Sequence, residues 1–491
     1  MGREEEIVKE RLRKIEELVN QKINPYAYSF DKKNSCFELQ EKYKKLKADK
    51  KTKDKVKVAG RVMTIRDIGK LIFVDLSDDK GKIQLQLQEQ SGKKQLEFFK
   101  KFIDTGDFVG IEGKVIRTKR GELTILVDKV ELLTKSLLPL PEKWHGLQDK
   151  EERYRKRYLD LIMNPEVKQV FVLRSKIINS IKELLNNKNF LEVDTPVLQA
   201  LYGGAAAKPF TTHLNALNMN LYLRVSNELY LKRLLVGGLE RVYEFARDFR
   251  NEGIDKTHNP EFTQVEIYQA YADYNDMMEL TEDIYNHAAK KVLGKTEFEY
   301  QGEKISLKKP WKRIKMNDAI KKYAGIDVDK MTLAKLKEFA SKNNVKLKGE
   351  ERGMIIAGVF EHFCEKQLIQ PTFVIDYPQE TTPLCKEKRG KLGYVERFEP
   401  YIAGMEVGNA YSELNDPVRQ KILLEKQARE LKKGNEEANP YDEDFVNALE
   451  YGMPPTGGLG LGIDRMIMLL TNSPSIRDVL LFPFMKNVGE K

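Results

Sequence analysis

Cysteines are scarce in this sequence, and long apolar runs are absent. The three cysteines among 491 residues, Cys36, Cys364 and Cys385, lie far apart, which excludes a Cys-x-x-Cys metal pair and predicts no disulfide framework. No stretch approaches the roughly 18 uncharged apolar residues of a membrane-spanning helix. The segment Gly2–Glu6 is acidic where a secretory signal is basic, and it does not fit a myristoylation motif. We therefore expect a cytoplasmic protein without a membrane partner.

The common nucleotide-binding fingerprints are missing as well. The glycine-rich segment 457–462 does not fit the pattern G-x-G-x-x-G in any register, and no Walker lysine follows it. The chain also has no internal repeat. The sequence therefore predicts neither a Rossmann nor a P-loop nucleotide site in this segment.

Charge is abundant and unevenly distributed. Lys and Arg number 85 against 75 Asp and Glu, which gives a net charge of +10, and nine lysines fall between Lys42 and Lys57. Such a run can dock a polyanion such as nucleic acid. A solvated surface would carry the same residues, so the run alone leaves both interpretations open.

The segment 56–140 shows the two-residue period of β-strands. Apolar residues alternate in several short stretches separated by turns such as Asp78–Gly81. Five strands within about 80 residues, with a helical stretch near Lys93–Phe102, are typical of a small barrel of the oligonucleotide-binding (OB) type. Before the barrel, helical spacing predicts a helix over residues 4–20, and the stretch 42–57 looks helical or frayed.

Helices and strands mix in the rest of the chain. Strands separated by hairpins as well as by helices favour a mixed, mostly antiparallel sheet over a doubly wound parallel one. The predicted domains are a helical extension (1–55), the barrel (56–140), a linker (141–165) and a larger domain (166–491) with an expected helical insertion at about 295–365. Within the larger domain the pattern predicts helices over 168–187, 275–293, 333–342 and from Pro417 to near Gly434, and strands over 221–225, 242–249, 262–268, 373–377 and 394–399.

One predicted hairpin carries chemically useful side chains close together. An extended chain would place Arg250 and Glu252 on one strand face, and the return strand from Phe262 would present Glu266 and Tyr268 on one face. A guanidinium is a flat fork of donors that can bind a phosphate oxygen and a carboxylate together. A structural hairpin with an Arg250–Glu252 ion pair is the alternative.

The glycine-rich segment 457–462 leads into an apolar helix that carries Arg465 in its first turn. Glycines let a ligand approach the backbone closely, and a phosphate would suit an arginine that reaches back over them. Close packing of the helix on a sheet would also explain the glycines, so this motif alone leaves both interpretations open.

Glu399 and Glu406 are hard oxygen ligands of the kind that Mg²⁺ takes beside substrate phosphates. Simple alternation places Glu406 opposite Asn409 and Glu413. A bulge near Gly408 would be needed to bring all three to one site.

In their order and spacing, three segments resemble the motifs of the class II aminoacyl-tRNA synthetases. Phe190–Pro196 resembles the first, dimer-forming motif, the Arg250 hairpin the second, and the Arg465 glycine segment the third. The barrel is similar to the anticodon-binding domain of the subgroup that charges aspartate, asparagine and lysine. The segments most similar to the lysine-charging branch are Gly203–Phe210, Glu228–Arg233 and Ser412–Pro417.

The resemblance implies an α+β protein: an OB-fold barrel followed by a class II catalytic domain built on a mostly antiparallel sheet flanked by helices. It implies a homodimeric ligase that joins L-lysine to tRNA(Lys) through a lysyl-adenylate, with ATP as substrate and Mg²⁺ as cofactor. Arg250, Glu252 and Arg465 would be catalytic. By the same resemblance, Arg250 would bridge the α-phosphate and the lysine carboxylate, Glu252 and His258 would hold ATP, Phe262 would stack on adenine, Arg465 would bind the γ-phosphate, and Glu399 and Glu406 would hold Mg²⁺.

The remaining implied roles concern lysine and the anticodon. Gly204 and Glu228 would bind the α-amine of lysine. In the barrel an exposed aromatic can stack on a uridine, and an amide or acid can read its pairing edge; a core position for Phe73 is the alternative. The other implied residues are Glu266, Tyr268 and Glu413 for the ε-ammonium, Asn409 for the carboxylate, and Phe73, Gln84 and Glu122 for the anticodon.

Two other functions are alternatives to charging with lysine. An enzyme for asparagine or aspartate conflicts with a pocket of three acids, which suits an ammonium group, provided that the acids converge. A non-catalytic tRNA-binding paralogue would be expected to lack an arginine or a magnesium acid, and here none of them is missing: Arg250, Arg465, Glu399 and Glu406.

Overall fold

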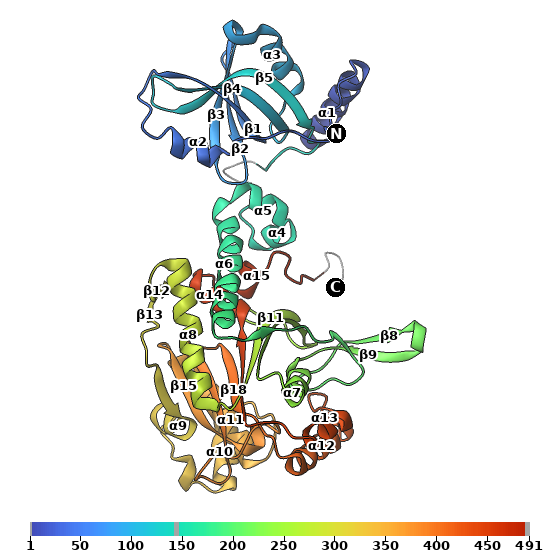
Figure 1. Cartoon of the computed structure of the whole chain (residues 1–491), viewed down its shortest axis with the longest axis vertical. Coiled ribbons are helices and arrows are strands. Elements are labelled where there is room, and N and C mark those ends of the chain that lie inside the picture. Colours follow the sequence, from blue (N-terminus) through green and yellow to red (C-terminus); the bar gives the residue numbers. More distant parts are fainter. Residues whose placement is uncertain (1, 142–146, 487–491) are drawn as a thin grey trace. The chain divides into compact units, whose positions relative to one another are not determined.

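The chain divides into two units between Gln148 and Asp149 (Figure 1). This computed structural model describes residues 2–141 and 147–486. None of the helices in these residues is long and apolar enough to cross a bilayer.

The first unit contains a closed five-stranded barrel. In β2 (Leu71–Ser77) the buried side chains are Ile72, Val74 and Leu76, which is the two-residue alternation read from the sequence. The other elements are β1 (Lys51–Asp67), β3 (Lys82–Gln88), α3 (Glu89–Phe102), β4 (Phe108–Arg117) and β5 (Leu123–Thr134). The strands close in the order β1-β2-β3-β5-β4, which confirms the predicted small barrel.

The N-terminal helices belong to the same unit as the barrel. Helix α1 (Arg3–Asn20) confirms the helix predicted over residues 4–20. Its buried Arg11 donates hydrogen bonds to the carbonyl oxygens of Thr105, Ser136 and Leu138 at 2.9–3.1 Å. The expected extension is therefore attached to the barrel unit by the Arg11 guanidinium, which donates to three backbone carbonyl oxygens.

The prediction of a helical or frayed stretch over residues 42–57 is wrong. Helix α2 (Cys36–Lys42) ends where that stretch begins, and β1 starts at Lys51. Lys51, Lys53 and Lys55 occupy alternate, exposed positions of the strand. Because lysine is a good helix former, its frequency concealed the two-residue period.

The expected linker, residues 141–165, is partly helical. Two short helices, α4 (Lys150–Arg155) and α5 (Arg157–Met163), follow Asp149 and belong to the second unit. Residues 142–146 of the expected linker lie outside the described residues.

A nine-stranded sheet forms the centre of the second unit. Its order is β14-β15-β16-β18-β19-β11-β10-β6, with β17 paired to β16. Among the described strands of this sheet, only the end pairs β14–β15 and β10–β6 are parallel, so the predicted mostly antiparallel sheet is confirmed. The strands are β6 (Leu191–Glu192), β10 (Arg241–Phe249), β11 (Glu261–Ala270), β14 (Lys312–Lys315), β15 (Thr372–Pro378), β16 (Tyr394–Ile402), β17 (Met405–Glu406), β18 (Gly408–Ser412) and β19 (Thr456–Gly462).

Helices cover both faces of this sheet (Figure 1). Successive strand residues enter different cores: Tyr243 and Ile267 pack in one, Val242 and Tyr268 in the other. The first core includes α6 (Pro165–Asn187), α8 (Tyr274–Leu293) and α14 (Ile463–Leu470), and the second includes α7 (Glu228–Val236), α9 (Met316–Tyr323), α11 (Arg352–Phe363) and α13 (Glu443–Glu450).

The segment 295–365 is mixed rather than helical. It contains a hairpin of β12 (Glu297–Tyr300) and β13 (Glu303–Ser306), and its strand β14 joins the edge of the central sheet. Four-residue strands are too short to show a clear period in sequence, which explains the incorrect expectation. The remaining elements are the small sheet β7 (Leu198–Gln199), β8 (Thr211–Leu214) and β9 (Met219–Leu223), and the helices α10 (Leu333–Lys342), α12 (Pro417–Lys432) and α15 (Ile476–Val479).

Candidate active site

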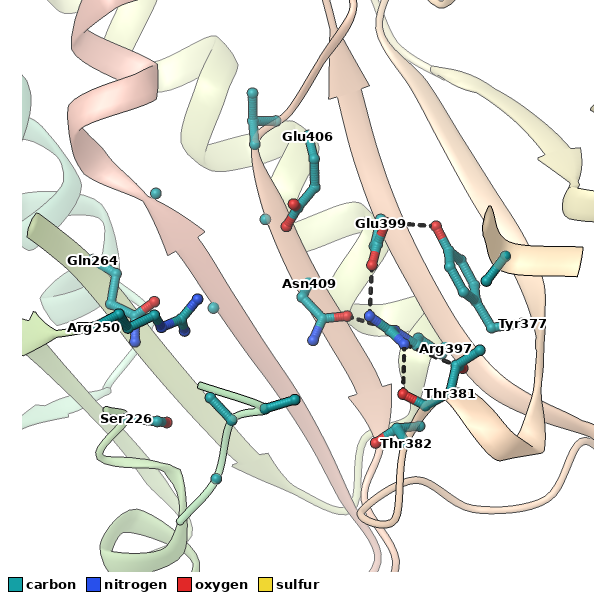
Figure 2. Close-up of a pocket in the computed structure, with 18 of the residues that line it drawn as sticks. Ser226, Arg250, Gln264, Tyr377, Thr381, Thr382, Arg397, Glu399, Glu406 and Asn409 are labelled. Carbon is teal, nitrogen blue, oxygen red and sulfur yellow. Dashed lines mark hydrogen bonds and ion pairs between the residues drawn. The ribbon is translucent and has the colours of Figure 1, made fainter. Parts of the chain in front are cut away.

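A cavity of about 860 Å³ lies over strands β11, β19 and β18 of the second unit. Figure 2 shows one part of it, with Arg250 and Gln264 on one side and the group around Arg397 and Glu399 on the other. Every residue predicted for ATP or lysine lines this cavity: Gly204, Glu228, Arg250, Glu252, His258, Phe262, Glu266, Tyr268, Glu399, Glu406, Asn409, Glu413 and Arg465.

The glycines of β19 form the floor of the cavity. A Cβ atom on Gly458 would collide with the Glu413 carboxylate and lie 2.6 Å from the Tyr268 ring, and one on Gly460 would lie 3.0 Å from Glu266. The absence of side chains on this strand therefore lets the acids of neighbouring strands lie across it. At Gly458 and Gly460 the neighbouring atoms are pocket side chains, whereas a Cβ atom on Gly457 would meet Asp273 and Met277 at the start of α8, as the packing interpretation predicted.

Arg250 stands just beyond the end of β10. The strand ends at Phe249, so the prediction of an extended strand through Glu252 is wrong, and Glu252 lies exposed in the loop that follows. The Arg250 backbone N–H donates to the Pro260 carbonyl at 2.9 Å, which fixes the start of the loop. No Arg250–Glu252 ion pair forms among the described residues; instead the guanidinium lies 5.0 Å from the centre of the Phe262 ring.

The return strand β11 presents alternate side chains to the cavity, as predicted. Gln264 donates to one oxygen of Glu266 and the Tyr268 hydroxyl donates to the other, both at 3.0 Å. Burial raises the pKa of Glu266 well above its usual range, and the charges of Glu228 and Asp248 raise it further. This carboxylate is therefore held in place before any ligand enters.

Arg465 joins the first turn of α14 to the loop after β10. Its guanidinium donates to the Glu406 carbonyl oxygen at 2.6 Å and to His258 Nε2 at 3.1 Å. The other ring nitrogen of His258 lies 2.8 Å from Asp255. Burial raises the pKa of Asp255, but hydrogen bonds from Thr257 and His258 outweigh it and lower that pKa to about 2.

Glu399 is the centre of a buried polar network (Figure 2). Its Oε1 accepts a hydrogen bond from Arg397 at 2.5 Å, and its Oε2 accepts from the hydroxyls of Tyr377 and Tyr401, each at 2.7 Å. Arg397 also donates to the Asn409 side-chain oxygen at 2.9 Å. The position of Glu399 is thus fixed by three donors.

The bulge that the sequence required near Gly408 is present. Tyr401 pairs with Glu406 and Phe398 pairs with Ala410, so three residue steps along β16 face four steps along the adjoining segment. One extra residue therefore lies between Glu406 and Ala410. It brings Glu406, Asn409 and Glu413 to one cavity.

The acids Glu399 and Glu406 fit a divalent cation in their charge and donor type. Burial raises the pKa of Glu406, and the negative charge of Glu399 raises it further. The positive charge of Arg465 acts in the opposite direction. A cation between the two acids would relieve that repulsion. Two carboxylates without further protein ligands suit Mg²⁺ that shares its coordination with phosphates and water.

Comparison with known proteins decides between the functions that the sequence left open. Residues 149–486 match the family described as tRNA synthetases class II (D, K and N), and residues 56–133 match the OB-fold nucleic acid binding domain. A lysine–tRNA ligase from Methanoculleus marisnigri is 51% identical over 479 residues, which are 97% of this chain and 94% of that protein. The chain belongs to the lysine–tRNA ligase family. Similar relatives with the same printed name include those of Clostridium novyi (51% identical; 98% of this chain, 94% of the relative) and Moorella thermoacetica (51%; 98% of each).

Lys232 is a site residue that sequence reasoning missed. It lies on α7, fully buried, with its Nζ 2.6 Å from Glu228 Oε1 and 2.5 Å from Glu413 Oε2. Burial alone would lower the pKa of Lys232, but the charges of Glu228 and Glu413 raise it above the usual range. The spacing of Glu228 and Lys232, four residues apart on a helix, was the available signal.

Arg397 was missed as well. It connects Glu399, Asn409 and the Thr381 hydroxyl, and so aligns the two predicted ligands on neighbouring strands. The Asn409 amide is further held because its nitrogen donates to the Tyr411 hydroxyl at 2.6 Å. The signal was the two-residue spacing from Arg397 to Glu399, which places both on one face of a strand.

Two of the predicted anticodon residues, Phe73 on β2 and Gln84 on β3, occupy outward-facing positions of adjacent strands, and Glu122 lies just before β5. Phe73 is half-buried and points away from the core, between the buried Ile72 and Val74. Gln84 on β3 accepts a hydrogen bond from Thr124 on β5 at 3.0 Å. Exposed Glu122 precedes Thr124 by two residues. Because Phe73 faces outward, the alternative of a core position for it is wrong.

Proposed function

We propose that this chain joins L-lysine to tRNA(Lys) in two steps. Lysine and ATP give lysyl-adenylate and pyrophosphate; the lysyl group then passes to a hydroxyl of the terminal adenosine of the tRNA, and AMP leaves. The observation that carries this proposal is one cavity that is lined by Arg250 and Arg465 at one end and by three buried acids at the other. The membership in the lysine–tRNA ligase family supports the same substrates.

Arg250 and Arg465 are the groups that we assign to the phosphates. Arg250 would contact both the α-phosphate and the lysine carboxylate, because its fork of donors can bind two oxygens at once. Arg465 would bind the γ-phosphate, with His258 beside it, and Glu252 would contact the nucleotide from the loop. No general base is needed, since the attacking carboxylate is already ionised, and the chain's contribution is positioning and charge stabilisation.

Phe262 is the residue that we assign to the adenine ring. The Arg250 guanidinium lies over this ring, 5.0 Å from its centre. Adenine would therefore take the ring face from Arg250, which leaves the guanidinium for the phosphate.

Glu399 and Glu406 would hold Mg²⁺. A bound magnesium ion neutralises charge on the departing pyrophosphate. Arg397, Tyr377 and Tyr401 fix the orientation of Glu399, and this rigidity favours one placement of the triphosphate.

Three acids and a phenol are assigned to the amino groups of lysine. Glu228 and the Gly204 carbonyl would bind the α-ammonium, while Glu266, Tyr268 and Glu413 would bind the ε-ammonium. Gly204 has a positive φ of 88°, and a Cβ there would lie 3.0 Å from Glu228. A glycine is therefore needed to bring this carbonyl close to the acid. Asn409, aligned by its two hydrogen bonds, would contact the lysine carboxylate.

The test of this function is pyrophosphate exchange into ATP with each of the twenty amino acids supplied singly. We expect exchange with lysine and only background with aspartate and asparagine. Exchange driven by asparagine or aspartate would refute the substrate, and a lack of exchange with every amino acid would favour a non-catalytic tRNA-binding protein.

The proposal extends to the anticodon. Phe73 would stack on an unpaired base and Gln84 and Glu122 would read base edges. Phe73→Ala should weaken binding of unmodified tRNA(Lys) transcript by about tenfold while lysine-dependent pyrophosphate exchange stays unchanged. An unaltered tRNA affinity in a filter-binding assay would remove Phe73 from this role.

We further propose a homodimer that works in the cytoplasm. Strand β6 ends the sheet, with no further strand paired to it among the described residues. Leu191 in β6 and Leu198 in the following strand β7 are exposed, as expected for an interface. Light scattering should give twice the chain mass, and Leu191→Asp should shift the measured mass toward that of one chain.

The three cysteines are free and buried, which suits the reducing compartment that we propose.

A further inference from the structure

Lys232 has no task in the mechanism proposed above, although burying an ammonium group is costly. It is fully buried on α7 and does not line the cavity, whereas its partners Glu228 and Glu413 do. The two acids therefore lie between Lys232 and the substrate space. The lysine contacts them from behind, from within the protein.

One carboxylate oxygen of Glu413 can bind a second cation in addition to Lys232. Glu413 Oε2 lies 2.5 Å from Lys232 Nζ and is committed to that ion pair. Glu413 Oε1 is buried and accepts no hydrogen bond within the described residues. A buried acceptor atom without a donor next to a cavity points to a ligand that donates a hydrogen bond.

The charged groups around Lys232 come from several elements. Glu228 shares its helix, Glu266 and Tyr268 approach from β11, and Glu413 follows β18. The other charged and titratable groups near these acids are Lys386, Cys385, Tyr411, Asp248, Arg250 and Arg397.

We propose that Lys232 sets the net charge of the amino-acid pocket by cancelling one of its three carboxylate charges. The bound ammonium groups favour the ionised forms of Glu228, Glu266 and Glu413, and together with Lys232 the pocket then presents two negative charges. The substrate lysine carries two ammonium groups, and its carboxylate faces Arg250. The charges of pocket and substrate therefore balance, which is the condition for burying them together. This inference rests on the proposed function.

The effect of Lys232→Met on lysine affinity distinguishes the two roles when it is measured in a variant that lacks one acid. A charge-setting Lys232 predicts tighter lysine binding on its removal, and a purely structural Lys232 predicts weaker binding. Glu413→Gln leaves two carboxylates and Lys232, a net charge of −1, and lysine should bind about 100-fold more weakly than to the wild type. Adding Lys232→Met to this variant restores a net charge of −2. We therefore expect Lys232→Met/Glu413→Gln to bind lysine about tenfold more tightly than Glu413→Gln alone.

The measurement is calorimetric titration of each full-length variant with L-lysine at about pH 8.5, where the remaining acids are more fully ionised. A second pair, Glu228→Gln with and without Lys232→Met, repeats the comparison at the other contact. Lys386→Met in the Glu413→Gln background is the matched control: it removes a nearby cation that does not bridge two acids, and it should improve lysine binding by less than about twofold.

The outcomes separate charge from packing. Tighter lysine binding in both double variants, with ATP affinity unchanged, supports the proposal. Lysine binding that stays the same or weakens, or double variants that no longer fold by circular dichroism, would make Lys232 a structural residue and overturn it. If the wild type shows no lysine-dependent pyrophosphate exchange, the proposed function itself fails, and that result is independent of the variants.

Discussion

The two ends of the cavity are built differently. At the lysine end, Glu228, Glu266 and Glu413 are each less than a tenth exposed, and their partners stand on strands and on α7. At the phosphate end, Glu252 and His258 are exposed on the loop between β10 and β11. Buried acids must be held by partners before the substrate arrives, whereas exposed side chains can adjust when ATP binds. The acids that we assign to lysine are therefore held in place by the fold, whereas the loop residues that we assign to ATP can adjust.

Arg250→Ala is expected to have the largest effect, because we assign Arg250 to both the α-phosphate and the lysine carboxylate. Lysine-dependent pyrophosphate exchange should fall by about 10³-fold, since charge on the reacting phosphate loses its main donor. The melting temperature should change little. Arg247→Ala, near the end of the preceding strand β10, is the matched control: the Arg247 side chain is exposed and pairs only with Glu261 in the described contacts, so activity should stay within about twofold. A variant that melts would instead assign Arg250 to the fold.

Glu413→Gln tests the lysine end alone. The lysine KM should rise about 100-fold because a buried ammonium loses its charged partner, while the ATP KM stays within about twofold. Steady-state kinetics with each substrate varied in turn gives both values. Equal losses for lysine and ATP would show that Glu413 supports the whole cavity rather than the lysine end.

The pH dependence of lysine binding sharpens the contrast further. Burial raises the pKa of Glu413 to about 8, although Lys232 acts to lower it. Below that pH the ligand-free carboxyl carries a proton, which must leave before an ammonium can bind. Lysine affinity should therefore rise about tenfold from about pH 6.5 to pH 8, and Glu413→Gln should flatten this rise. Calorimetry at several pH values checks this; an equally steep rise in the variant would assign the titration to another group.

His258→Ala should give the smallest effect, at the exposed end. It removes one hydrogen bond to Arg465, so the ATP KM should rise about fivefold and the lysine KM should not change. His213→Ala, at another exposed histidine on β8, is the control and should leave both values unaltered. A rise in the lysine KM would mean that the two ends are coupled through this loop.

Much of the site was predictable because strand alternation and chemical type point to the same residues. The two-residue period placed Glu266 and Tyr268 on one face, and the need for a bulge followed from the spacing of Glu406 and Asn409. The structure contains both features. Wherever a regular strand carries the ligands, the sequence is enough to bring them together.

Other features were not predictable, for physical reasons. The end of β10 before Arg250 depends on the hydrogen bond between Arg250 N–H and the Pro260 carbonyl, a contact across a loop. The role of Lys232 depends on Glu413, which is distant in sequence. Local pattern cannot reveal an ion pair whose partners meet only through the tertiary fold.

The bare floor of β19 restricts how this cavity could be remodelled. A designer who wished to admit a different amino acid would first think of filling space beneath the substrate. Even a methyl group at Gly458 would displace Glu413, so the smallest change of shape also removes a charge. Volume and charge cannot be altered separately at that position, and new selectivity would have to come from the walls.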